Sequence, residues 1–174
     1  VSAIVNNGLG IRGMGNIPVF VTRGLDDNGR ARESDVRDAM EQCEASGAKI
    51  ISLSLAGPKI SNAMQDIIER MHTNGLLLVA AAGNDGLYQG SFPASHPNVV
   101  SVTAVSKNES LWMGSNYGPW IELAGPGHQV TSTSIMNGVY VYSNYSGTSM
   151  ANPHVAGAAA LLWSHFPNCT NTQI

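Results

Sequence analysis

The sequence predicts an α/β fold, a parallel sheet with helices on both faces, in a single domain over residues 1–174. Three observations predict it. Short apolar segments alternate with amphipathic helical patterns, and strands joined by helices form parallel sheets through right-handed crossovers. The segment LLLVAAAG, residues 76–83, has no polar alternation, which is typical of a strand covered on both faces. Apolar residues make up 43% of the chain and charged residues only 12%, which indicates a large buried core.

Five segments have the composition of strands, and helical patterns separate the first three. The segment ESDVRDAMEQCEASG places Val36, Met40 and Cys43 on one helical face, which predicts a buried thiol at Cys43. In SNAMQDIIERMHTNG, Ser61 is the expected N-cap and Gly75 the expected end of the helix. The expected strands are residues 17–22, 49–55, 76–81, 99–105 and 120–123.

A last helix is expected in SGTSMANPHVAGAAALL, residues 146–162. It is rich in Ala, Gly and Val, which predicts a helix buried nearly all round. Ligands of open parallel sheets lie beyond the carboxyl ends of the strands. The chemistry is therefore expected just after Leu55 and Ala81, in the segments AGP and AGND.

Composition excludes several classes of partner. The formal net charge is −3 and Lys and Arg form no cluster, which argues against nucleic-acid binding. The longest apolar run, residues 76–82, is far shorter than the roughly 20 residues of a membrane span. The chain begins without a visible secretion signal, as a processed or excised piece would. Three sequons, at Asn108, Asn144 and Asn168, permit glycosylation if the protein is secreted.

Ser149 lies at the start of the last helix, two residues after Gly147. Free backbone N–H groups and the positive end of the helix dipole stabilise negative charge there, as catalysis at a carbonyl group requires. The same pattern also fits a simple helix cap and a glycine turn, so on local grounds both interpretations stay open. His154 follows five residues later and points away from Ser149, because 3.6 residues complete a helical turn. We expect it to be a packed, hydrogen-bonded histidine and not the base.

The segment GLGIRG matches the dinucleotide-binding pattern with Gly8, Gly10 and Gly13. That interpretation requires a helix directly after the glycines. Gly15 and Pro18 follow instead, so a dinucleotide site is only a remote alternative.

The segment SGTSMANPHVAGAAALL resembles the nucleophile segment of the subtilisin-like serine proteases, in which Gly-Thr-Ser-Met-Ala precedes Pro-His-Val-Ala-Gly. The resemblance extends over nearly the whole chain. IISLSLAGP resembles the substrate-binding strand of that family, LLLVAAAGND its oxyanion segment, SFPASHPNVVSVTAV the following loop and strand, and ELAGPG the stretch before the nucleophile. The resemblance implies a subtilisin-like fold, here incomplete at both ends, and a secreted hydrolase that cleaves polypeptides.

The resemblance also implies roles for individual residues. Ser149 corresponds to the nucleophile and Asn84 to the side-chain donor of the oxyanion hole. Ser54, Leu55 and Ala56 correspond to the strand that pairs with the substrate, and the family usually has Gly in place of Ala56. Independently of the resemblance, Asp85 lies beside Asn84, and we hypothesise that its charge at the pocket rim favours basic substrate side chains. Ala82 and Gly83 correspond to a wall of the substrate pocket in that family.

The family supplies an Asp and then a His before the Ser, each in its own glycine-rich motif, and neither motif is in this chain. A hydroxyl without a positioned base is a poor nucleophile, so we expect the chain alone to be nearly inactive. Its partner would then be the missing part of its own catalytic domain. The alternative is a non-catalytic fragment or one half of a nicked enzyme.

The same resemblance marks VNNGLGI as a calcium loop. Asn7 would provide its side-chain oxygen, and Val5, Leu9 and Ile11 their backbone carbonyl oxygens, which suit a hard cation. A simple glycine-rich turn is an equally good interpretation of this segment.

Overall fold

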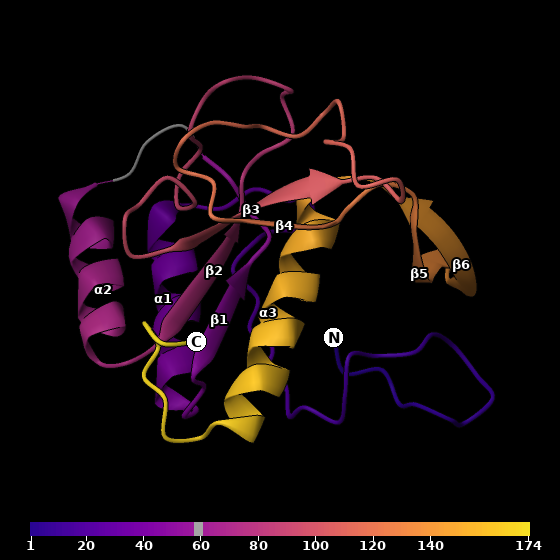
Figure 1. The fold of residues 1–174 in the computed structure, drawn as a ribbon, viewed down its shortest axis with the longest axis horizontal. Coiled ribbons are helices and arrows are strands. Elements are labelled where there is room, and N and C mark those ends of the chain that lie inside the picture. The colour runs from indigo at the N-terminus through magenta and orange to yellow at the C-terminus, as the bar shows by residue number, and fades with distance from the viewer. Residues whose placement is uncertain (58–60) are drawn as a thin grey trace.

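The computed structural model describes residues 1–57 and 61–174. Pro58, the last residue of the quoted segment IISLSLAGP, lies outside the described residues. A four-stranded sheet with the order β1-β2-β3-β4 runs through the centre of the molecule (Figure 1), and each neighbouring pair is parallel as predicted. The strands are β1 (Ile50–Leu53), β2 (Leu77–Ala81), β3 (Val100–Val105) and β4 (Leu123–Pro126).

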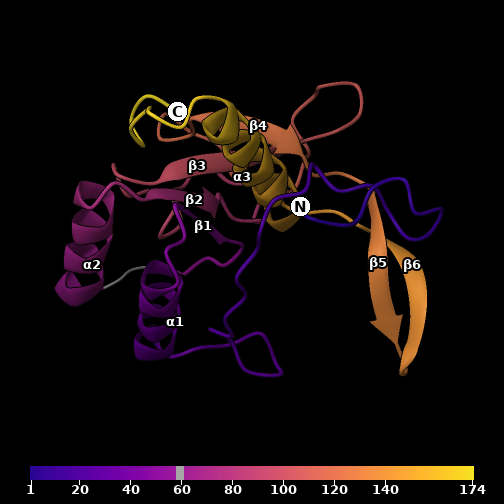
Figure 2. The same ribbon diagram turned by 90° about the horizontal axis from the view of Figure 1, so that it is seen from below.

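Helices cover both faces of this sheet. Figure 2 shows α1 (Glu33–Ala45) and α2 (Asn62–Thr73) on one side and α3 (Thr148–His165) on the other. The predicted caps of α2 are present. The Ser61 hydroxyl accepts the N–H of Met64 at 3.3 Å, and Gly75, at φ +89°, follows the end of the helix.

The two faces of the sheet have separate apolar cores, and β2 contributes to both. Leu78 and Ala80 belong to the core beneath α1 and α2, whereas Leu77 and Val79 belong to the core beneath α3. All five residues of β2 are buried. This two-sided burial is the physical reason for the unbroken apolar run, because neither face of the strand meets water.

Two of the expected strands differ from the structure. Residues 17–22 form no strand, because no described backbone segment pairs with them; Thr22 instead donates its hydroxyl to the Ala39 carbonyl at 3.2 Å. The strand expected at residues 120–123 begins only at Leu123. Residues 118–121 form a turn first, in which the N–H of Ile121 donates to the Gly118 carbonyl.

A hairpin of β5 (Val130–Met136) and β6 (Val139–Tyr145) was not predicted. Within residues 1–57 and 61–174 the two strands pair only with each other, and they project from the rest of the molecule (Figure 2). Asn137 and Gly138 form its turn with φ of 50° and 78°. Asn-Gly between alternating segments is a strong signal for a tight hairpin, so the sequence does carry this information.

The expectation that α3 is buried nearly all round is wrong. Its sheet-facing residues Ala151 and Ala156 are buried, but Leu161 and Leu162 are 40% and 42% exposed. The sheet covers only one side of the helix, and apolar composition alone does not show which side.

Cys43 was predicted to be a buried thiol, and the structure shows it only half-buried. Both Cys43 and Cys169 are free thiols. In the described part of the chain, no helix is long and apolar enough to cross a membrane.

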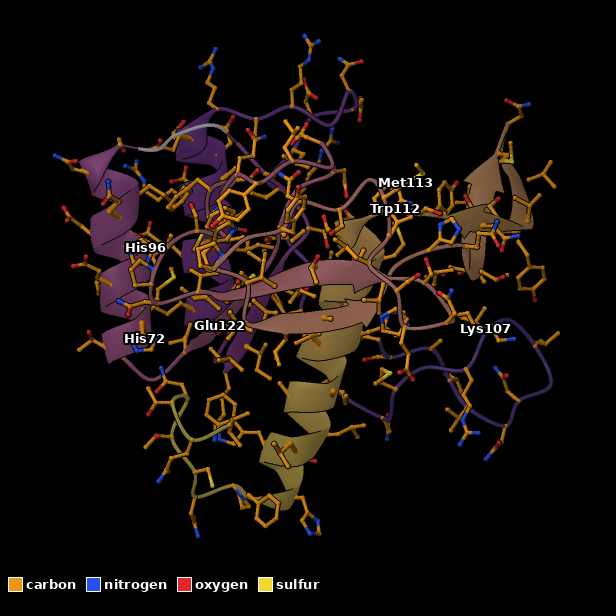
Figure 3. The ribbon with its side chains drawn as sticks, turned by 45° about the horizontal axis from the view of Figure 1, so that its top comes forward. His72, His96, Lys107, Trp112, Met113 and Glu122 are labelled. Atoms are coloured by element: carbon orange, nitrogen blue, oxygen red, sulfur yellow. The ribbon has the colours of Figure 1, made fainter. Side chains whose placement is uncertain are left out.

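His96 is a buried histidine on the α2 side of the sheet, near His72 (Figure 3). Its Nδ1 accepts the N–H of Asn98 at 3.1 Å, which requires a neutral ring. Burial lowers the pKa of His96 below its ordinary value of 6.5; the negative charge of Glu69 opposes this shift and His72 adds to it.

This depressed pKa predicts a chain that loses stability in mild acid. Below about pH 6.5 the unfolded state binds a proton that the folded state does not, so the free energy of unfolding falls with decreasing pH, by at most about 1.4 kcal/mol per pH unit, until the folded pKa is passed. Urea unfolding between pH 7.5 and 5 measures this fall in the free energy of unfolding. His96→Asn, which keeps an acceptor for the Asn98 N–H, should flatten the curve. His165→Gln, at an exposed histidine, should leave it unchanged.

Candidate active site

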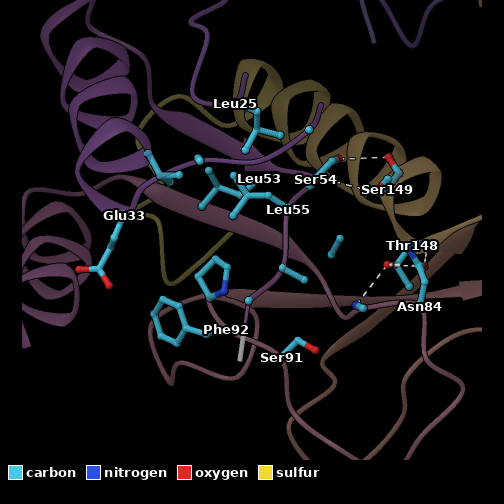
Figure 4. Close-up of a pocket in the computed structure, with 18 of the residues that line it drawn as sticks. Leu25, Glu33, Leu53, Ser54, Leu55, Asn84, Ser91, Phe92, Thr148 and Ser149 are labelled. Carbon is cyan, nitrogen blue, oxygen red and sulfur yellow. Dashed lines mark hydrogen bonds between the residues drawn. The ribbon is translucent and has the colours of Figure 1, made fainter. Parts of the chain in front are cut away.

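A cleft of about 1120 Å³ lies at the carboxyl ends of β1 and β2, where the sheet topology predicts a site. Residues distant in sequence line it together (Figure 4). Of the predicted residues, Ala82 does not line the cleft, because it is fully buried and its backbone bonds to Val102 and Asn116. The lining includes Ser54, Leu55, Ala56, Gly83, Asn84 and Ser149.

Ser149 is the second residue of α3 and is half-buried. Pro153, four residues later, has no N–H and leaves the Ser149 carbonyl without its helical partner. The Ser54 hydroxyl donates to that carbonyl at 3.1 Å instead. The Ser149 hydroxyl itself lies 3.5 Å from the Ser54 carbonyl, and the Ser149 N–H has no hydrogen bond among the described residues. Both the hydroxyl and the N–H are therefore available to a ligand at the helix N-terminus.

Asn84 follows β2 and is fixed by its side-chain oxygen. Its Oδ1 accepts the backbone N–H of Thr148 at 2.8 Å and the Thr148 hydroxyl at 2.9 Å (Figure 4). Thr148 is fully buried, and its hydroxyl also accepts the N–H of Gly83 at 3.2 Å. The Nδ2 of Asn84 has no partner among residues 1–57 and 61–174. This amide group is thus held beside the nucleophile segment with its donor free.

Thr148 is the residue of this site that the sequence analysis missed. It holds the side chain of Asn84 through two hydrogen bonds and the backbone of Gly83 through a third. Its position directly before Ser149 carries no local signal for that function. Only the approach of the turn after β2 to the start of α3, two segments 64 residues apart in sequence, reveals it.

No described histidine hydrogen-bonds to Ser149. His154 donates from Nδ1 to the Met150 carbonyl at 2.8 Å, and this packed, hydrogen-bonded state is the predicted one. His128 lies within hydrogen-bond distance of the Ser146 hydroxyl, at 3.1 Å, and stacks on Trp112. In the part of the chain that the structure describes, the Ser149 hydroxyl therefore has no base.

Residues 54–56 extend beyond β1 along one side of the cleft. No backbone hydrogen bond outside the described helices and strands involves them. The next residue, Gly57, exchanges two backbone hydrogen bonds with Phe92, which closes the far end of the segment. Apart from the Ser54 carbonyl, which lies 3.5 Å from the Ser149 hydroxyl, the polar backbone groups of residues 54–56 are therefore free to pair with an added extended peptide.

Asp85 is an exposed acid beside Asn84 that also lines the cleft. Its Oδ2 accepts hydrogen bonds from Asn116 Nδ2 and Gln89 Nε2, both at 3.1 Å. These two amides hold the carboxylate without neutralising its charge. A negative charge is thus available at this rim of the cleft.

The glycine-rich segment near the N-terminus has neither element of a dinucleotide site. No strand precedes Gly8 and no helix begins directly after Gly13, since the first helix of the described chain begins at Glu33. This structure overturns the dinucleotide alternative. The four expected calcium ligands share the same exposed loop, in which Asn7 Oδ1 accepts the N–H of Leu9 at 3.1 Å.

Comparison with known proteins gives a consistent result. The sequence model of the subtilase family, Peptidase S8, matches residues 1–174. The chain is 41% identical to the thermophilic serine proteinase of Bacillus sp. (strain AK1), over 96% of this chain and 41% of that proteinase. It is 34% identical to subtilisin DY of Bacillus licheniformis, over 99% of this chain and 64% of that protein.

The fold comparison agrees. A solved protease structure from Pseudoalteromonas arctica matches with a TM-score of 0.93 and 32% identity, and covers 99% of this chain and 58% of that one. The chain therefore spans between 41% and 64% of the length of these relatives.

Proposed function

Because this chain belongs to the subtilase family of serine proteases, we propose that it forms the nucleophile and oxyanion part of a subtilisin-type endopeptidase. Ser149 would attack the carbonyl carbon of a peptide bond and form an acyl-enzyme, which water then hydrolyses. The negative charge that develops on the carbonyl oxygen would be stabilised by the Ser149 N–H and the Asn84 Nδ2. The observation that carries this proposal is the Thr148 clamp on Asn84 Oδ1, which leaves Nδ2 as a free donor beside the nucleophile.

We propose that the base and its orienting carboxylate come from residues of the complete polypeptide outside these 174. The absence of a histidine partner for Ser149 in residues 1–57 and 61–174 supports this assignment, as do relatives that are considerably longer than the chain. The same observation favours a second candidate, in which this chain is one half of a nicked enzyme and the other half carries the base. The missing part of the domain is then its partner in either case.

Labelling with a fluorophosphonate tests the proposal. The complete polypeptide should be labelled rapidly at Ser149 and not in the variant Ser149→Ala, with the modified peptide identified by mass spectrometry. The 174-residue chain alone should be labelled far more slowly, because its hydroxyl has no base. Rapid labelling of the isolated chain would refute the proposed origin of the base, and labelling at another serine would refute the nucleophile.

We propose that polypeptide substrates bind in extended form against residues 54–56 and that Asp85 favours a basic side chain before the scissile bond. The charge is exposed, so its effect should be modest. Asp85→Asn should lower the preference for Lys over Leu at that position by about two- to fivefold in kcat/KM. Paired fluorogenic peptides measure this ratio, and equal cleavage of both peptides by the unaltered enzyme would contradict the assignment.

A structural calcium ion at residues 5–11 also remains a proposal. Asn7 and the carbonyl groups of Val5, Leu9 and Ile11 would provide four neutral oxygens, whereas calcium takes six to eight. The site therefore fits only with further ligands from the complete polypeptide. If the ion binds there, chelation should lower the thermal unfolding midpoint of the complete polypeptide, and Asn7→Ala should abolish that difference.

We propose that the polypeptide acts outside the cell. The subtilase membership and the three sequons support this location. Detection of the protein in the culture medium of its source organism tests it, and retention of all activity within cells would contradict it.

A further inference from the structure

Asn116 is a completely buried side chain that binds the loop around Asn84. Its Oδ1 accepts two backbone N–H groups of that loop, from Asp85 at 3.0 Å and from Leu87 at 3.2 Å. Its own backbone N–H donates to the Gly83 carbonyl at 3.0 Å. One residue thus fixes the main chain on both sides of Asn84.

The amide nitrogen of Asn116 adds a second set of contacts. Three acceptors lie within hydrogen-bond distance of Nδ2: the Ala82 carbonyl at 3.2 Å, Asp85 Oδ2 at 3.1 Å and the Ser91 hydroxyl at 3.2 Å. The loop also packs closely against this nitrogen. A Cβ added to Gly83 would lie only 2.4 Å from it.

Asn116 is in turn held by β3. The Thr103 hydroxyl donates to the Asn116 carbonyl at 3.1 Å and lies 2.7 Å from the Ser115 hydroxyl, and all three residues are buried. β3 is one of the two central strands of the sheet. Asn116 therefore links the loop to the centre of the sheet, in addition to the backbone hydrogen bonds of Ala82, Gly86 and Leu87.

The side chain of Asn84 itself is held separately, by Thr148 at its Oδ1. The position of Nδ2 therefore depends on two anchors. Thr148 sets the orientation of the amide, and Asn116 sets the backbone from which it projects. A displacement of such a donor by about 1 Å can lower turnover by about 10²-fold.

We propose that Asn116 is a positioning residue for catalysis, which acts through Asn84 by fixing the loop of residues 82–91. This inference rests on the proposed function, since it presupposes that Asn84 donates to the oxyanion. Asn116 does not itself line the cleft, but it hydrogen-bonds to Asp85 and Ser91, which do. With a substrate that has Leu before the scissile bond, and so does not depend on the charge of Asp85, its effect should fall on the transition state and leave substrate binding nearly unchanged.

A double-mutant cycle in the complete peptidase tests the proposal. Asn116→Ala should lower kcat by about 10- to 100-fold and change KM by less than about threefold. In an Asn84→Ala background the same substitution should cost less than about threefold, because the donor that it misplaces is already absent. Hydrogen exchange should show lost protection of the Asp85 and Leu87 amides. Asn116→Ser, which keeps a small polar side chain at the buried position but shortens it by the amide group, provides a second variant if the alanine variant does not fold, and the same losses are expected of it.

Asn171→Ala is the matched control, because it makes the same change at a buried asparagine whose Nδ2 donates to the carbonyls of His72 and Leu76, outside the loop of residues 82–91. It should lower the unfolding midpoint while kcat stays within about twofold. Equal losses for Asn116→Ala in both backgrounds would overturn the positioning proposal and leave the proposed function intact. An unchanged kcat in Asn84→Ala alone would instead refute the oxyanion role on which both rest.

Discussion

If Asn84 donates to the oxyanion as proposed, Asn84→Ala is expected to lower kcat of the complete peptidase by about 10²–10³-fold, which is the loss on removing one side-chain amide donor from the oxyanion hole of a subtilisin. The physical reason is that charge develops on the carbonyl oxygen only as Ser149 attacks. A donor held by Thr148 before the reaction begins stabilises that charge without reorganisation. KM should change little, because the uncharged carbonyl of the substrate gains less from the same hydrogen bond.

Steady-state kinetics with a peptide substrate measures this split between kcat and KM. Asn108→Ala makes the same chemical change in an exposed turn, where the side chain bonds, among the described residues, only to Ser110, and it should leave both constants unchanged. A rise in KM with unchanged kcat for Asn84→Ala would assign this residue to ground-state substrate binding and contradict the oxyanion role.

Gly83→Ala is expected to destabilise the chain by about 2–5 kcal/mol. Gly83 has φ +104°, which side chains rarely adopt, and its added Cβ would lie 2.4 Å from Asn116 Nδ2 and 2.7 Å from the Ser91 hydroxyl. Either the loop or the buried asparagine must move. Because the next residue is Asn84, the same change should also lower kcat in the complete peptidase.

Urea unfolding of the 174-residue chain measures the loss of stability. Gly75→Ala is the matched control: this glycine has φ +89° but open space around it, so only the backbone strain of about 1–2 kcal/mol applies. The difference between the two variants isolates the steric overlap with Asn116 and Ser91. Equal losses for both would show that the loop absorbs the extra methyl group without cost.

The parts of the fold that sequence reasoning predicted are those in which local pattern and burial agree. β2 is an unbroken apolar run because it is covered on both faces, and α2 begins and ends at the predicted cap and glycine. Where the predictions fail, local pattern and tertiary environment disagree. Residues 17–22 have strand composition, but in the described structure no partner backbone pairs with them. Composition records the tendency to pair and not the presence of a partner.

The sequence by itself determined the family, the parallel topology and the two residues, Ser149 and Asn84, to which the proposed chemistry is assigned. These follow from local patterns and ordered motifs, which survive without coordinates. Only the tertiary structure decided that Thr148 anchors the amide of Asn84 and that Asn116 fixes the loop around it. The physical reason is that a hydrogen bond between segments 31 or 64 residues apart depends on how strands and helices stack, and no local pattern encodes that distance.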